Sequence, residues 1–297
     1  MTLRDSRLGE AILTDPARRL AGSPIAALSV GFLLLVVVSA VLAPLLAPQD
    51  PLIQDLLKSR EPPFWWPGAK EPLGGLLGTD SLGRDLFSRI LYGSRISLIV
   101  GVAAVGLSMA VGIPLGLIAG YREGPVGDLI MRAGDALVAI PTLFLAISII
   151  VILGPDLQNL IIVLATWRWV VFARVVRADV LRLKQEEHIV AARSLGFGPG
   201  RILGRHILPN IGSPLIVLAS LSLAEVILAE AALSFLGMGV QPPTPTWGGM
   251  LAEARDYLGI APWMALAPGV AITATILAIN LVGDWLRDVL DPRLRDT

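Results

Sequence analysis

The stretch Glu186–Asn210, EEHIVAARSLGFGPGRILGRHILPN, is a polar, arginine-rich segment set between long apolar segments. One helix face is predicted by residues at the i, i+3, i+4 and i+7 spacing: His188, Ala191, Ala192 and Leu195. Gly196 follows where a helix end favours glycine, because glycine takes the left-handed conformation without strain. Gly198 and Pro199 suit the start of a second helix, which Pro209 is expected to end. The pattern predicts a helical hairpin that is presented to a soluble partner; an ordinary solvated connector is the alternative.

The composition indicates a membrane protein. Hydrophobic residues make up 54% of the 297 residues and the mean hydropathy is +0.71, well above what a soluble core of this size needs. A formal net charge of +0 offers no overall basic field for nucleic acid. The lack of cysteine excludes disulfides and cysteine metal sites, and the two histidines argue against a histidine metal site.

Six apolar stretches approach the length of about 20 residues that a helix needs to cross a hydrocarbon core. They lie near Pro24–Leu46, Leu98–Ala119, Ala133–Leu153, Leu157–Ala173, Ile211–Leu236 and Met264–Leu286. The first follows Arg18 and Arg19, as the core of a signal peptide would. Its apolar run continues to Ala47, beyond the roughly 7 to 15 residues of such a core, so we expect an uncleaved anchor. The prediction is an all-α integral membrane protein with six transmembrane helices.

Lysine and arginine gather on one side of these spans, as they do in cytoplasmic loops. That side carries Arg4, Arg7, Arg18, Arg19, Arg122, Arg132, Arg174, Arg177, Arg182, Lys184, Arg193, Arg201, Arg205, Arg287, Arg293 and Arg295. The opposite side carries fewer: Lys58, Arg60, Lys70, Arg84, Arg89, Arg95 and Arg255. Both termini and the hairpin are therefore expected to be cytoplasmic.

Two outer segments stand out. The loop from Pro48 to about Ser97 is rich in proline, glycine and tryptophan and is expected to form an extracytoplasmic cap. Its last part, from Arg84 to Ile96, favours a helix on the membrane surface. The second segment carries Trp247, Tyr257 and Trp263. Aromatic residues of this kind suit the membrane interface.

Within the spans, small residues and charges have different meanings. A stripe of small residues recurs every four positions in the second span, at Ala104, Ser108, Gly112, Gly116 and Gly120, and predicts close helix packing.

Glu225 and Glu230 lie in the fifth span, where a charge costs about 2.5 to 3.5 kcal/mol on insertion scales. We expect both to face a cavity or a partner subunit, with a translocation-path role and a structural role left open. Asp135 and Asp284 lie near helix ends, where solvation explains them.

Catalytic motifs are missing from the sequence. It contains no glycine-rich P-loop with its Lys and Ser/Thr, and no Gly-x-Ser-x-Gly or His-Glu-x-x-His pattern. Gly196-Phe197-Gly198 lacks the third glycine of a dinucleotide fingerprint. We therefore predict no catalytic residue, no metal site and no cofactor in this chain.

The order Ala191-Ala192, Gly196 and Ile207-Leu208-Pro209 resembles the cytoplasmic coupling loop, the EAA loop, of bacterial ABC importer permeases that work with a substrate-binding protein. Further segments are similar to the C-type subunit of dipeptide and oligopeptide permeases: LGTDSLGRDLFSR from Leu77, ALSFLG from Ala232, VQPP from Val240, Trp247-Gly248 and LDPRL from Leu290. The chain departs from the loop signature at Val190, where the family usually has glutamate, and at His206, often isoleucine. A contact made by that glutamate is not carried over.

The resemblance implies the architecture of a type I ABC importer permease in the bacterial inner membrane. Residues 1–97 would form the cytoplasmic tail, the first helix and the extracytoplasmic loop, and residues 98–297 the permease core with five helices. The hairpin 185–209 would dock on an ATPase subunit through Val190, Ala191, Ala192, Gly196, Ile207, Leu208 and Pro209. Glu225 and Glu230 are the candidates for the translocation path.

The implied partners are a second homologous permease, two ABC ATPases that bind ATP and Mg, an extracytoplasmic substrate-binding protein and membrane lipid, with no nucleic acid. Relatives of this type handle peptides, nickel complexes or glutathione, so a peptide or related small solute is the expected substrate. Two rival functions remain. A self-contained secondary transporter or channel would be expected to carry more intramembrane ionisable residues. A membrane scaffold leaves the hairpin unexplained.

Overall fold

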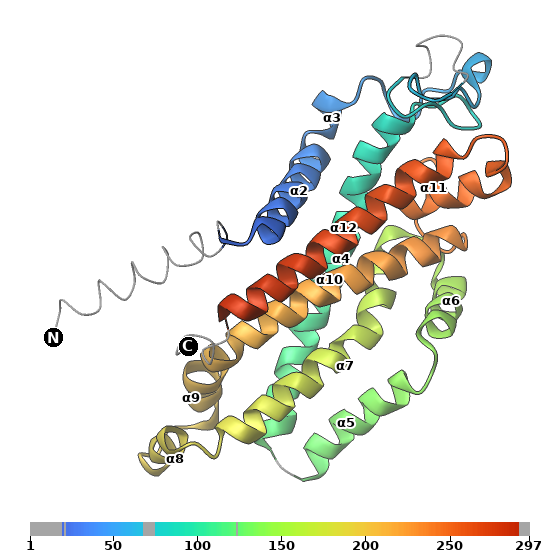
Figure 1. Cartoon of the computed structure of the whole chain (residues 1–297). Coiled ribbons are helices and arrows are strands. Elements are labelled where there is room, and N and C mark those ends of the chain that lie inside the picture. The colour runs from blue at the N-terminus through green and yellow to red at the C-terminus, as the bar shows by residue number, and fades with distance from the viewer. Residues whose placement is uncertain (1–19, 21, 68–74, 123, 291–297) are drawn as a thin grey trace.

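The computed structural model describes residues 20, 22–67, 75–122 and 124–290, and this part of the chain is mostly helical (Figure 1). The main helices are α2 (Pro24–Val41), α3 (Ala43–Leu46), α4 (Leu86–Tyr121), α5 (Pro125–Val138), α6 (Thr142–Leu153), α7 (Leu157–Leu183), α8 (Glu187–Ser194), α9 (Pro199–Ile202), α10 (Gly212–Phe235), α11 (Trp247–Ala254) and α12 (Trp263–Leu290). Short turns of 3₁₀ or π helix are η1 (Leu56–Lys58), η3 (Leu203–Ile207), η4 (Leu208–Ile211) and η5 (Arg255–Tyr257). The prediction of an all-α protein is confirmed.

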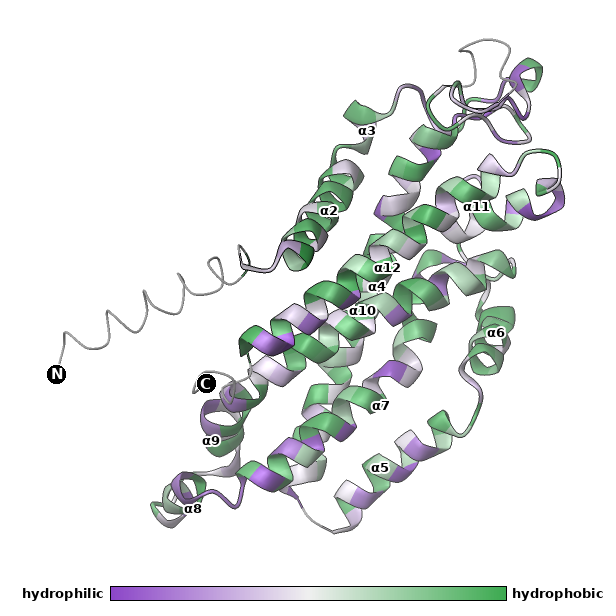
Figure 2. Ribbon diagram, in the orientation of Figure 1, coloured by the Kyte–Doolittle hydropathy of each residue, from purple (hydrophilic) through white to green (hydrophobic). Residues whose placement is uncertain are grey.

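Among the described residues, five helices are long and apolar enough to cross a membrane: α2, α4, α7, the stretch Pro199–Phe235 and α12. A bent pair, α5 and α6, raises the number to six if it is counted as one span. Figure 2 shows apolar residues along the long helices and polar residues gathered around α8 and α9. This distribution is expected of helices that lie in hydrocarbon and of a hairpin that lies in water.

The predicted third span over Ala133–Leu153 is wrong as a single helix. The chain bends by 88° between α5 and α6. Pro141 stands directly before α6, at its N-cap. Proline lacks an amide hydrogen and disfavours helical conformation in the residue before it, so a helix does not run through this point without distortion.

The second span begins earlier than predicted. Asp85 caps α4 by accepting a hydrogen bond from the Ser88 amide at 2.7 Å, and the helix then runs without interruption to Tyr121. The prediction of a separate surface helix from Arg84 to Ile96 is therefore wrong, because those residues form the first turns of the span. The expected boundary between residues 97 and 98 falls inside this helix.

Pro209 does not end the second hairpin helix, contrary to the sequence prediction. The π turn η3 and the 3₁₀ turn η4 follow α9 directly and lead into α10. Such turns change the hydrogen-bond register, so the helix passes the proline without needing the amide hydrogen that proline lacks. The hairpin is thereby joined to the fifth span by continuous helical chain.

The small-residue stripe of α4 packs against α7, as predicted. All five of its members are buried. A Cβ atom added to Gly112 would lie 2.4 Å from the Trp169 carbonyl oxygen, and one added to Gly116 would lie 2.6 Å from the Ala173 carbonyl oxygen. Two backbones approach this closely only where no side chain separates them.

Replacing Gly116 by valine should destabilise the permease, since the new side chain would meet backbone atoms that cannot move aside. Overpacking of this kind costs about 1 to 3 kcal/mol, or more where the backbone is the obstacle. The yield of folded protein and its thermal unfolding midpoint measure the effect. Gly106→Val in the same helix is the matched control, because a Cβ there meets nothing within 4 Å. Equal losses in the two variants would contradict the packing argument.

Candidate functional site

The hairpin of α8 and α9 lies at one end of the helical bundle, opposite α3 and α11 (Figure 1). It follows α7 after a short turn, and the helical chain returns from it through η3 and η4 into α10. The hairpin is therefore joined directly to two of the long helices, α7 and α10.

Gly196 closes α8 as predicted, with a φ angle of +82°. Its amide donates to the Arg193 carbonyl at 2.9 Å, and the Phe197 amide donates to the Ala192 carbonyl at 3.2 Å. These are the two hydrogen bonds of a Schellman motif, which requires a left-handed residue at this point. The predicted start of the second helix is confirmed too, with Gly198 as N-cap and Pro199 as first residue.

The hairpin has a buried face and an exposed face. Ile189, Ala192, Ile202 and Ile207 are buried against the core. On the exposed face, Val190 is 48% and Leu195 is 74% exposed, and Ala191, Gly196, Leu208 and Pro209 are also exposed. The predicted docking residues thus divide: Ala192 and Ile207 hold the hairpin on the protein, and the other five remain accessible. On the predicted face, His188, Ala191 and Leu195 are exposed and Ala192 is buried.

Arginines of the hairpin also stabilise it. The Arg201 guanidinium lies over the Phe197 ring, 4.1 Å from its centroid, and Phe197 stacks on His206 with the centroids 6.1 Å apart. Arg193 lies over Tyr121 at the end of α4, 5.7 Å from the ring centroid. Cation–π contacts of this kind stabilise the position of the hairpin relative to the span. The contact with Tyr121 was not predicted, because no local sequence pattern relates two residues so far apart in the chain.

Glu225 and Glu230 have opposite environments, although both lie in α10. The Glu225 side chain is 61% exposed and forms an ion pair with Arg168 of α7. Arg168 also donates to the Ser222 hydroxyl at 3.2 Å. The carboxylate therefore stands on the surface of the subunit at membrane depth, where bare lipid is the least favourable neighbour.

Glu230 is fully buried within the chain. Its carboxylate accepts hydrogen bonds from the Ser97 hydroxyl at 3.0 Å and the Ser234 hydroxyl at 2.7 Å. The expectation that Glu230 faces a cavity or a partner is therefore wrong, because Ser97 on α4 and Ser234 on α10 supply the polar contacts that a buried carboxyl group needs.

A charge cluster that the sequence analysis did not identify lies at the opposite end of the bundle. It comprises Asp80, Arg84, Arg89 and Glu253. Arg84 contacts Asp80 at 2.6 Å and Glu253 at 2.7 Å. Arg89 also pairs with both carboxylates, with 2.6 Å to Glu253. The dense charges of the 80–89 segment were a visible signal, but the sequence does not show that Glu253 would join them.

Two predicted interface tryptophans are buried instead. The Trp247 indole donates to the Ile90 carbonyl at 3.1 Å, and the Trp263 indole donates to the Thr79 carbonyl at 3.3 Å. Both rings lie within hydrophobic clusters. Together with the charge cluster, these contacts join the loop before α4 and the first turns of α4 to α11 and α12. No group of three or more metal-binding side chains occurs in the part of the chain that the structure describes.

Residues 112–296 match the family model described as "Binding-protein-dependent transport system inner membrane component". The chain belongs to this family. Residues 13–63 of the permease also match the model for the N-terminal TM domain of oligopeptide transport permease C. The protein is therefore a membrane-embedded permease subunit of an ABC transporter, a class that works with ATPase and binding-protein partners and has no catalytic site of its own.

Named relatives of the permease support the assignment. It is 47% identical over 267 residues to the di/tripeptide transport system permease protein DppC of Pseudomonas aeruginosa, covering 89% of this chain and 87% of that protein. It is 49% identical over 219 residues to the glutathione transport system permease protein GsiD of Pectobacterium atrosepticum, covering 74% of this chain and 73% of that protein. A chain of the inward-facing MetNI methionine ABC transporter shares the fold, with a TM-score of 0.57 and 19% identity over 68% of this chain and 96% of that one.

Proposed function

We propose that this permease forms half of the translocation pathway of an ATP-driven importer for peptides or a related small solute. The observation that carries the proposal is the exposed hairpin, which is closed at Gly196 and anchored on the core by Ile189, Ile202 and Ile207. Relatives named for di/tripeptides and for glutathione support a substrate with a peptide backbone. The broken pair α5 and α6 counts as one span in the proposed six-helix, type I arrangement.

In this proposal, closure of two ATPase subunits on Mg-ATP moves the hairpin and changes which side of the membrane the pathway faces. Val190, Ala191, Leu195, Leu208 and Pro209 form the accessible surface on which an ATPase docks. The buried isoleucines make the hairpin move with the core, and the continuous helical chain into α10 carries the movement to the level of Glu225. A second permease completes the pathway, and an extracytoplasmic binding protein delivers the solute at the end that holds α11.

Orientation and docking can be tested together, since the chain has no cysteine and each introduced cysteine is unique. In intact cells, a membrane-impermeant maleimide should label Leu57→Cys, because Leu57 is 95% exposed in η1, and should label Leu195→Cys only after permeabilisation. A short bifunctional reagent should cross-link Leu195→Cys to a co-expressed ATPase and leave Leu57→Cys without that product. Labelling of Leu195→Cys from outside would overturn the proposed orientation, and no cross-link at any hairpin cysteine would overturn the docking role.

The proposed pathway surface includes Glu225 and Arg168. A charged side chain that is exposed on a transmembrane helix needs a solvated path or a partner subunit against it. Glu230 does not belong to this surface, because it is enclosed within the chain.

Replacing Glu225 by glutamine should lower solute uptake severalfold while the assembled complex keeps its basal ATPase activity. The change removes the partner charge of Arg168 without changing the side chain's size. Uptake into proteoliposomes measures the effect. Asp135→Asn is the matched control, since Asp135 forms an exposed ion pair with Arg174 near a helix end. Unchanged uptake in the Glu225 variant would remove this residue from the pathway.

A further inference from the structure

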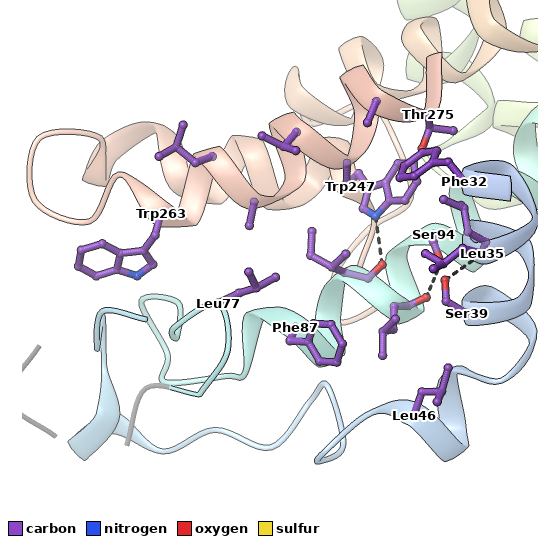
Figure 3. Close-up of a pocket in the computed structure, with 18 of the residues that line it drawn as sticks. Phe32, Leu35, Ser39, Leu46, Leu77, Phe87, Ser94, Trp247, Trp263 and Thr275 are labelled. Atoms are coloured by element: carbon purple, nitrogen blue, oxygen red, sulfur yellow. Dashed lines mark hydrogen bonds between the residues drawn. The ribbon is translucent and has the colours of Figure 1, made fainter. Parts of the chain in front are cut away.

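An apolar cavity of about 600 Å³ lies between α2, α4 and α12 (Figure 3). These parts of the three helices lie at the end of the bundle opposite the hairpin (Figure 1). Each helix contributes one face with the i, i+3, i+4 and i+7 spacing, starting at Phe32 on α2, Phe87 on α4 and Ala267 on α12. Three apolar helix faces thus converge without filling the space between them. On α12 the face is made largely of alanines, and these short side chains leave the hollow.

The cavity offers almost nothing to water or to a polar solute. The Ser39 and Ser94 hydroxyls that line it donate to the backbone carbonyls of Val36 and Leu91, and the Trp247 indole donates to a carbonyl as well. Thr275 also lines the cavity, and its buried hydroxyl has no hydrogen-bond partner among the described residues. A bound water needs two to four polar partners, and this single hydroxyl is too few. A peptide, with its many backbone donors and acceptors, fits the cavity still less.

The depth and the mouth of the cavity match hydrocarbon. Its lining on α12 runs from Trp263 to Thr275, roughly 18 Å of helix at about 1.5 Å per residue. One leaflet accounts for about half of a hydrocarbon core that is roughly 30 Å thick. Leu35 and Val270, which line the cavity, are both 63% exposed on helices apolar enough to span a membrane. The cavity therefore opens to the side, at the depth of lipid chains.

We propose that this cavity binds one acyl chain of a glycerophospholipid from the leaflet that lies at the α3 end of the bundle. Protein interiors rarely leave voids of this size, and a hydrocarbon chain restores the dispersion contacts that an empty apolar space lacks. The site has a structural consequence. Only 22% of the α2 span is buried inside the chain, so the acyl chain acts as a filler that joins α2 to α4 and α12.

Photo-cross-linking tests the proposal in the assembled complex. The complex is reconstituted in nanodiscs with a phospholipid that carries a diazirine at the end of one acyl chain, and adducts are located by peptide mass spectrometry. We expect adducts on the cavity faces of α2 and α12. Ala271→Phe combined with Ala274→Phe fills the hollow and should remove most of these adducts. Leu277→Phe is the control: this residue is 56% exposed on the same helix, is absent from the lining, and should leave the labelling unchanged.

Labelling that is equal in the filled and control variants would overturn the proposal, because it would show contact with bulk lipid alone. Absence of adducts from the cavity would overturn it as well. A protein cross-link from Ala271→Cys to a second permease would also overturn it and would assign the cavity to an interface. If the double variant does not assemble, Ala274→Leu reduces the volume more gently and should lower the adduct yield in part. None of these readouts requires transport, so failure here is distinct from failure of the proposed function.

Discussion

Substitution of Gly196 by valine is expected to abolish most solute uptake while the complex still assembles. The residue has a φ angle of +82°, a conformation in which a β-branched side chain is a strong outlier. Left-handed geometry costs an ordinary L-residue about 1 to 2 kcal/mol. Relief of that strain opens the turn and breaks the two hydrogen bonds that close α8. Free energies of this size change a population by roughly 5- to 30-fold, so we expect uptake to fall by about tenfold or more.

The readout that separates coupling from folding is the ratio of solute transported to ATP hydrolysed in proteoliposomes. A variant whose hairpin is misplaced should hydrolyse ATP with little transport, or lose stimulation by the binding protein. Gly200→Val is the matched control, because a Cβ at either glycine meets nothing within 4 Å and only Gly196 has positive φ. Equal uptake in the Gly196 variant and the wild type, at equal subunit levels, would end the coupling role of this turn.

The hairpin shows how far local sequence signals predict structure. Gly196, Gly198 and Pro199 were assigned correctly because their roles depend on backbone conformation, which the residue type itself constrains. Pro209 was assigned wrongly, because the local rule for proline predicts a helix end. The π turn before Pro209 shifts the hydrogen-bond register and lets the helix continue. Tertiary context decides between these outcomes, and a single sequence does not contain it.

The two glutamates of α10 show the limit for candidate sites. Both are single charges in one apolar span, five residues apart, and the sequence gives no reason to separate them. The structure does, because Ser97 comes from another helix to enclose Glu230, whereas Glu225 meets Arg168 at the surface. The residues that contact these two glutamates lie far away in the sequence. A hydropathy pattern therefore identifies a charged residue within a span but does not predict its role.

The charge cluster leads to the second large effect, which concerns stability. Asp80 is buried, and it pairs with both Arg84 and Arg89 while accepting hydrogen bonds from the Leu82 amide at 2.8 Å and the Arg84 amide at 3.0 Å. Asp80→Asn keeps the side chain's shape and removes its charge, leaving two buried guanidinium groups with Glu253 alone. Loss of one partner from a buried ion pair costs about 3 to 5 kcal/mol. We expect a clearly lower thermal midpoint and a reduced yield of folded permease.

Asp256→Asn provides the comparison, since Asp256 is 75% exposed and lies 3.4 Å from an exposed Arg255. Surface pairs of this kind contribute about 0 to 1 kcal/mol, so this variant should unfold at nearly the wild-type temperature. If the two aspartates proved equally dispensable, the cluster would not be what holds the loop before α4 onto α11. Glu253 is the cluster member on α11, so Glu253→Gln should also lower the thermal midpoint. The double variant with Asp80→Asn should lose less unfolding free energy than the sum of the two single losses, because the residues belong to one network.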